Sequence, residues 1–102
     1  MRLSKKQLDA IHKSFVAHFL PLDTLWLFGS RVDDLKKGGD IDFYIETHYN
    51  DSAQAIEKQI HFLRDLKKAI GDQKIDVVLN VVNENKQQRI YDEAKTTGVQ
   101  LI

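Results

Sequence analysis

The segment LFGSRVDDLKKGGDIDFYIE, residues 27–46, contains the pattern that decides the fold. It begins in an apolar run, turns at Gly29 and Ser30, and enters a second run in which apolar and polar residues alternate. Alternation predicts a strand whose two faces differ: one carries Ile41, Phe43 and Ile45, and the other carries Asp40, Asp42, Tyr44 and Glu46. Residues 30–39 are too short for a parallel crossover, so we expect an antiparallel pair with a broken turn of helix between the strands.

Two helices are predicted on either side of this segment. Residues 4–20 have helical spacing, and Ser4 with Gln7 three residues later is a capping-box pattern. Residues 51–71 form the clearest helical pattern, capped by Asp51 or Ser52 and stopped by Gly71. The expected buried stripe of this second helix is Ile56, Ile60, Leu63, Leu66 (or the stem of Lys67) and Ile70.

The C-terminal part is predicted to add a strand and a helix. Residues 74–82 are apolar enough for a strand lying centrally in a sheet. Asn83 is the expected cap of a last, mostly polar helix, and Gly98 is its expected stop. Residues 99–102 are expected to add a terminal strand or to tuck under the sheet. The sequence therefore predicts an α/β fold, a single small mixed sheet with helices packed on one face, as one domain over residues 1–102.

Composition limits the classes of function. The 102 residues include 15 basic and 15 acidic side chains, so no overall field favours a long nucleic acid or an anionic membrane. There is no cysteine, which excludes a disulfide framework and a thiolate metal site. The N-terminal residues lack the apolar core of a signal peptide, and no apolar run approaches membrane-spanning length. We expect a cytoplasmic protein without membrane contact.

Asp40 and Asp42 are the first candidate metal ligands. Two residues apart on a strand, their side chains leave the same face about 7 Å apart at the backbone. Carboxylates this close repel each other, and a divalent cation such as Mg²⁺ offsets that repulsion with oxygen ligands. The alternative is that both aspartates simply face water on a half-exposed strand.

Asp76 is a third carboxylate in the predicted strand 74–82. It interrupts an otherwise apolar run, where an unpaired charge is costly. By alternation it shares a face with Val78 and Asn80. If the two strands are neighbours, Asp76 lies beside Asp40 and Asp42, and three carboxylates on one face suit a site for two Mg²⁺ ions about 4 Å apart.

Gly29 and Ser30 are candidate phosphate-binding residues. A glycine at a strand end allows close approach of a phosphate, and the following amides with the serine hydroxyl can donate to it. By itself the pair is also compatible with an ordinary turn. Combined with three carboxylates, it predicts a triphosphate at the turn and metal ions at the aspartates.

The spacing of these residues resembles the signature of the DNA polymerase beta-like nucleotidyltransferase superfamily. The similarity consists of Gly29-Ser30, nine intervening residues, and Asp40 and Asp42, with Asp76 where a third carboxylate is expected. The short chain and its closing segment, residues 89–102, are similar to the minimal nucleotidyltransferases. The resemblance implies a polymerase beta-like nucleotidyltransferase core over nearly the whole chain.

The resemblance also implies roles for individual residues. Asp40 and Asp42 would hold both Mg²⁺ ions, one of which also binds a nucleoside triphosphate. Asp76 would complete the shell of the other ion and orient or deprotonate the acceptor hydroxyl. Ser30 would bind the terminal phosphates, and Arg31 matches an arginine frequent at that position in the family.

The chain departs from the family pattern just after the arginine. Many relatives carry a second basic residue where this chain has Val32, Asp33 and Asp34. Lys36 and Lys37 either replace that positive charge or belong to a solvated loop.

Minimal nucleotidyltransferases are commonly antitoxins paired with a small helical HEPN ribonuclease toxin. The resemblance implies transfer of AMP from ATP to a tyrosine hydroxyl of such a partner (AMPylation). One alternative is an antitoxin that neutralises its partner by occlusion, and another is nucleotidyl transfer to a small molecule.

Trp26, Phe28 and Tyr44 are expected to share the carboxylate face. Either a terminal segment covers these three side chains, or they form a partner surface or a wall on which a base stacks.

Overall fold

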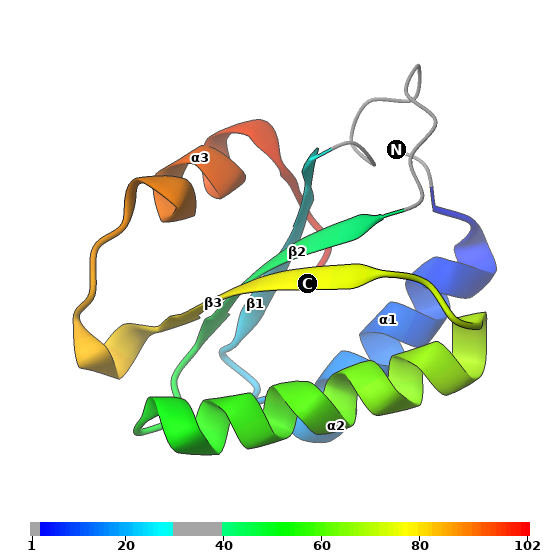
Figure 1. Ribbon diagram of the computed structural model, residues 1–102, viewed down its shortest axis with the longest axis horizontal. Coiled ribbons are helices and arrows are strands. Elements are labelled where there is room, and N and C mark those ends of the chain that lie inside the picture. The colour runs from blue at the N-terminus through cyan, green and yellow to red at the C-terminus, as the bar shows by residue number, and fades with distance from the viewer. Residues whose placement is uncertain (1–2, 30–39) are drawn as a thin grey trace.

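The computed structural model describes residues 3–29 and 40–102 (Figure 1). The elements follow in the order α1 (Lys5–His18), β1 (Thr24–Phe28), β2 (Ile41–Thr47), α2 (Ser52–Ile70), β3 (Ile75–Val81), the 3-10 turn η2 (Val82–Glu84), α3 (Arg89–Thr97) and β4 (Val99–Gln100). The four strands form one mixed sheet in the order β3-β2-β1-β4. The predicted α/β class is confirmed. No helix in the described part of the chain has the length and apolar character needed to cross a membrane.

The start of α1 confirms the capping box. The Ser4 side chain accepts from the Gln7 amide at 3.1 Å, and the Gln7 side chain accepts from the Ser4 amide at 2.9 Å. These two bonds satisfy amide groups that have no partner within the helix. Ile11 and Phe15 then point into the core, where each is about 1% exposed.

The strand pairing confirms the antiparallel prediction for β1 and β2, in which Leu25 pairs with Ile45 and Phe28 with Asp42. β4 pairs antiparallel with β1, so the C-terminal residues extend the sheet. β3 pairs parallel with β2. The predicted central position of β3 is wrong, because β3 lies at one edge of the described sheet and β2 lies inside. The apolar character of β3 instead reflects contacts on both faces, where Val77 and Val78 pack against different clusters.

The larger core lies between the sheet and the pair α1 and α2. It gathers the predicted inward face of β2 with residues of both helices: Ile11, Phe15, Phe19, Leu25, Leu27, Ile41, Phe43, Ile45, Phe62, Leu66 and Ile75. The predicted stripe of α2 is wrong in part, since Ile56 and Ile60 are 48% and 59% exposed. Phe62 is buried instead, because its ring meets those of Phe15 and Phe43 at centroid distances of 5.7 and 6.0 Å.

The prediction that the helices pack on one face is wrong for α3. Figure 1 shows α3 on the opposite side of the sheet from α1 and α2. There it forms a second, smaller cluster in which Tyr91 and Ala94 pack on Trp26 and Tyr44. The aromatic side chains on that sheet face supply enough apolar surface to bury a helix that is otherwise polar. A segment of the chain therefore covers Trp26 and Tyr44.

The structure corrects the predicted start of α3 and confirms its predicted end. The predicted cap at Asn83 is wrong. The Asn83 side-chain amide Nδ2 donates to the backbone carbonyls of His48 and Tyr49, and α3 begins only at Arg89. Gly98 ends the helix as predicted. A Cβ at Gly98 would overlap the Ala94 carbonyl and lie 2.8 Å from the Leu27 carbonyl, so a side chain there would push α3 off β1.

Candidate carboxylate site

Asp42 and Asp76 lie opposite each other on the neighbouring parallel strands β2 and β3. Register partners on adjacent strands are about 4.8 Å apart and point to the same side of the sheet. That side is the one on which Tyr44 meets α3. Asp42 is half-buried and Asp76 is exposed. The structure thus brings together two of the predicted site residues from distant parts of the sequence.

Asp40 lies immediately before β2, beside the residue that precedes β3. The Ile41 amide donates to the Lys74 carbonyl at 3.0 Å, which ties the beginnings of the two strands together. Asp40 Oδ2 is 3.9 Å from the Lys74 ammonium, and both side chains are largely exposed to water. Lys74 is a residue that the sequence analysis missed. Its position as the first residue of the predicted strand 74–82, two residues before Asp76, was the available signal.

The pKa of the Asp42 carboxyl is raised above its ordinary value of 3.8. Partial burial is the main cause, and the negative charges of Asp76 and Asp40 add to it. The positive charge of Lys74 acts in the opposite direction. Burial and the neighbouring negative charges together therefore disfavour ionisation of Asp42.

Gly29 ends β1 directly beside Asp42. Its φ of 79° lies in the left-handed region that side chains disfavour. A Cβ at this position would overlap the Asp42 Oδ2 atom and come within 3.1 Å of the Asp42 carboxyl carbon. Gly29 was predicted from the sequence to allow close approach of a phosphate. In the structure, the Asp42 carboxylate occupies the space that a side chain at Gly29 would need.

Several predicted residues lie outside the described part of the chain. These are the candidate nucleotide-binding residues and the charged stretch that follows them: Ser30, Arg31, Val32, Asp33, Asp34, Lys36 and Lys37. The expected turn of helix between the strands falls in the same range. Their predicted roles stay predictions.

The donor set at the site suits a hard cation. Within residues 3–29 and 40–102, no three His, Asp or Glu side chains are arranged as a ready metal-binding group. Asp42 and Asp76 nevertheless offer adjacent carboxylate oxygens, the ligand type that Mg²⁺ prefers. The raised pKa of Asp42 reflects in part repulsion that a divalent cation would offset. The residues present therefore fit a magnesium ion held by this pair, with Asp40 as the nearest further ligand.

Farther along the same face, a polar network joins the sheet to α3. The buried Tyr44 hydroxyl donates to Glu46 Oε2 at 2.7 Å and accepts from Asn80 Nδ2 at 3.0 Å. Burial and the hydrogen bond to Glu46 raise the pKa of Tyr44. Lys95 of α3 lies 3.1 Å from Glu46 Oε2 and 5.3 Å from the Trp26 ring centroid. The network fixes the position of α3 relative to the carboxylates.

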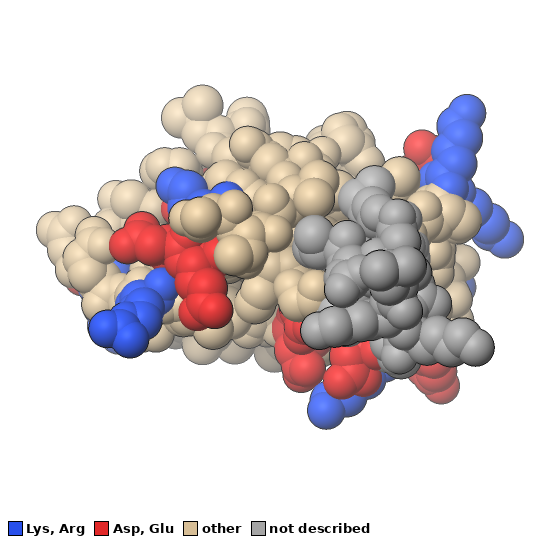
Figure 2. Space-filling model, turned by 90° about the horizontal axis from the view of Figure 1, so that it is seen from above, with Lys and Arg blue, Asp and Glu red and all other residues tan. Residues whose placement is uncertain are grey.

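Charges of both signs occur among the described residues on one face of the molecule. Figure 2 shows Lys and Arg side chains beside Asp and Glu side chains on the face seen from above, in keeping with 15 charges of each sign.

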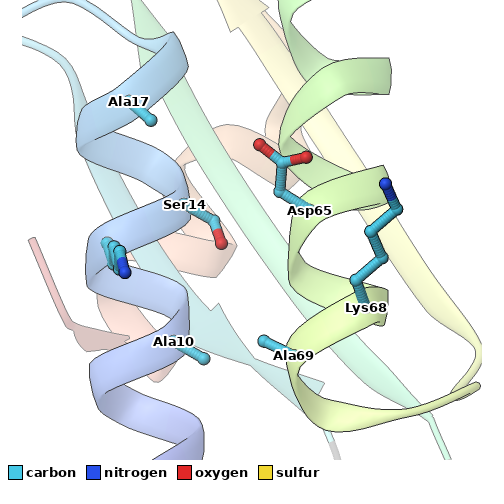
Figure 3. Close-up of a pocket in the computed structure, with 7 residues that line it drawn as sticks. Ala10, Ser14, Ala17, Asp65, Lys68 and Ala69 are labelled. Atoms are coloured by element: carbon cyan, nitrogen blue, oxygen red, sulfur yellow. The ribbon is translucent and has the colours of Figure 1, made fainter.

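A separate groove of about 330 Å³ lies between α1 and α2, on the opposite side of the sheet. Figure 3 shows that small side chains of α1, Ala10, Ser14 and Ala17, line one wall and that Asp65, Lys68 and Ala69 of α2 line the other. Asp65 Oδ2 is 2.5 Å from His18 Nε2, which links the two helices at this groove. The groove shares no lining residue with the carboxylate site.

Comparison with known proteins adds no family to these observations. No protein-family model matches the chain, and no curated protein matches its sequence.

Proposed function

We propose that the chain is a magnesium-dependent nucleotidyltransferase that transfers AMP from ATP to a tyrosine hydroxyl of a helical HEPN ribonuclease partner. The observation that carries the proposal is the pairing of Asp42 with Asp76 across β2 and β3, with Gly29 against Asp42. Gly29 and Asp42 belong to the nucleotidyltransferase-like pattern, and Asp76 is the third aspartate, from a distant part of the sequence. The three residues lie next to one another on the sheet.

Each residue has a distinct task in this proposal. Mg²⁺, when bound, would stabilise the charge that develops on the triphosphate. Asp42 and Asp76 would hold the cation, and Asp40 would complete the ligand set. Asp76, the exposed member, would accept the proton of the tyrosine hydroxyl. The tyrosine oxygen would then bond to the α-phosphorus, the bond from the α-phosphorus to the bridging oxygen would break, and pyrophosphate would leave.

The exposure of the carboxylates supports a macromolecular acceptor. α3 packs on Trp26 and Tyr44, whereas Asp76 remains exposed and Asp40 partly exposed at the neighbouring strand ends. A tyrosine on the surface of another protein could therefore reach the site without a rearrangement of α3.

Intact-mass measurement on a candidate HEPN ribonuclease tests this proposal. After incubation with ATP, Mg²⁺ and the wild-type chain, the partner should gain the mass of one or more AMP units and stay inactive after repurification. Asp42→Asn should give no mass gain, whereas Asp72→Asn, at an exposed position before β3, should behave as wild type.

Two other results would point to the alternatives. An unchanged mass, with ribonuclease activity restored on separation, would favour neutralisation by occlusion. An unmodified and uninhibited partner, together with AMP transfer to an aminoglycoside or a similar small alcohol, would favour a small-molecule acceptor.

A further inference from the structure

A polar hollow lies on the same sheet face as the carboxylates, between β2, β3 and α3. Its volume is about 240 Å³, and Glu46, Asn80 and Gln87 are among the side chains that line it. Glu46 and Asn80 are register partners, four positions beyond Asp42 and Asp76 on the same two strands. The hollow is therefore about 13 Å farther along the strands than the carboxylate pair.

Hydrogen bonds hold the floor of this hollow in place. Glu46 and Asn80 are joined through the buried Tyr44 hydroxyl, at 2.7 and 3.0 Å. Lys95 reaches the same Glu46 oxygen from α3 at 3.1 Å. Because these partners come from three different elements, the polar groups are positioned by the fold and need little reorganisation on binding a ligand.

The charges at the hollow disfavour a phosphate and favour a neutral ligand. Two carboxylates, of Glu46 and Asp92, line it together with one ammonium group, that of Lys95. A phosphate would meet a net negative charge there. A neutral heterocycle with an amino group could instead donate to a carboxylate or carboxamide oxygen.

The two carboxamides at the hollow suit adenine in particular. Asn80 contributes one from the sheet, and the exposed Gln87 contributes the other from the segment before α3. A carboxamide carries a donor and an acceptor side by side, which complements the N6 and N7 edge of adenine. On the corresponding edge, O6 and N7, guanine presents two acceptors, so a carboxamide with one donor and one acceptor matches that edge less well.

We propose that this hollow binds the adenine base of the nucleotide whose phosphates lie at the carboxylates. The inference rests on the function proposed above. Because α3 covers Tyr44 on β2, the nucleotide would run along the β3 side past the half-buried Val78, with its 5′ phosphate near Asp42 and Asp76 and its base near Asn80. Gln87 would contact the base from the α3 side and would make the site selective for ATP over GTP.

The side-chain amide signals of Asn80 and Gln87 provide a direct test by nuclear magnetic resonance. Nitrogen-labelled protein in Mg²⁺ would be titrated separately with ATP, GTP and inorganic tripolyphosphate. ATP should shift both amide signals, GTP should shift them less at equal concentration, and tripolyphosphate should leave them in place. Unshifted signals at a saturating ATP concentration would overturn the assignment of the base to this hollow.

The affinity of Gln87→Ala for ATP and for tripolyphosphate provides a second test of the adenine site. Loss of its hydrogen bond to the base should weaken ATP binding about three- to tenfold and leave tripolyphosphate binding unchanged. Gln54→Ala is the matched control, because Gln54 is an exposed glutamine on α2, across the sheet. It should bind both ligands as the wild type does.

The outcomes separate this inference from the proposed function. Wild-type affinity for ATP in Gln87→Ala would overturn the adenine site while leaving nucleotidyl transfer in place. If the wild-type chain with Mg²⁺ bound neither ATP nor tripolyphosphate, both the adenine site and the nucleotidyltransferase function would be rejected.

Discussion

Asp42 and Asp76 are direct register partners on β2 and β3, so the sheet holds two like charges side by side at its α3 face. Burial is the main cause of the raised pKa of Asp42, and the negative charges of Asp76 and Asp40 raise it further. A pair of carboxylates kept despite this repulsion is the arrangement expected of a cation site.

Asp42→Asn should abolish Mg²⁺-dependent transfer and raise the thermal midpoint of the metal-free protein. The amide keeps the shape of the side chain, removes a charge needed for Mg²⁺ and ends the repulsion with Asp76 and Asp40. Calorimetry in EDTA and a transfer assay measure the two effects. A variant that is less stable than wild type, or that keeps full activity, would contradict the charge argument.

Gly29→Ala should destabilise the fold by about 1–2 kcal/mol through its positive φ alone. Overlap with Asp42 Oδ2 should add to this loss and weaken Mg²⁺ binding by displacing the carboxylate. Gly71→Ala is the matched control, because Gly71 also has a positive φ, of 92°, but an added Cβ meets nothing within 4 Å. Unchanged Mg²⁺ affinity in both Gly29→Ala and Gly71→Ala would show that contact of the added Cβ with Asp42 has no role at the site.

Lys74→Gln should increase the affinity for Mg²⁺ about two- to threefold at low ionic strength. The Lys74 ammonium lies 3.9 Å from Asp40 Oδ2 and competes with a cation for the same negative charge. Both side chains are largely exposed, so the gain should disappear in high salt. Titration calorimetry with Mg²⁺ at two salt concentrations measures it, with Lys68→Gln, on α2, as the control. A lower affinity in Lys74→Gln would mean that the lysine supports the site instead.

Asp65→Asn should lower the urea midpoint above pH 3.8 and match the wild type at lower pH. The hydrogen bond from His18, aided by Arg64, lowers the pKa of Asp65 below its ordinary value of 3.8. Because the folded-state pKa is the lower one, the stabilisation is present above pH 3.8 and is lost as the pH falls through the lowered value. Circular dichroism in urea across a pH series measures this. A difference in urea midpoint between Asp65→Asn and the wild type that stays constant at every pH would contradict this linkage. The control variant Asp9→Asn should have the wild-type urea midpoint at each pH.

Alternation predicted the strands and the face that each carboxylate occupies, whereas the neighbouring position of β2 and β3, on which the carboxylate pair depends, entered the prediction only as a condition. Ile41, Phe43 and Ile45 could face the core only if Asp42 faced the other way, which fixed the face of the site. The same parity placed Asp76 on that face. The sequence was therefore enough to predict which sheet face carries Asp42 and Asp76, because strand side chains alternate between the two faces.

The remaining features depend on contacts that a single sequence does not show. The rotation of α2 follows from ring packing around Phe62, so apolar spacing alone selected Ile56 and Ile60 wrongly. The side of the sheet that α3 covers depends on its fit to Trp26 and Tyr44. The edge position of β3 was hidden because its faces are covered by separate clusters, which makes an edge strand look central.

Label transfer from ATP tests the central claim of nucleotidyl transfer most directly. A HEPN ribonuclease partner would be incubated with Mg²⁺, the chain, and ATP labelled at either the α- or the γ-phosphate. Nucleotidyl transfer predicts that the partner retains the α label, that the γ label leaves as pyrophosphate, and that Asp42→Asn transfers neither. A partner that retains the γ label, or retains no label while still being inhibited, would contradict the account.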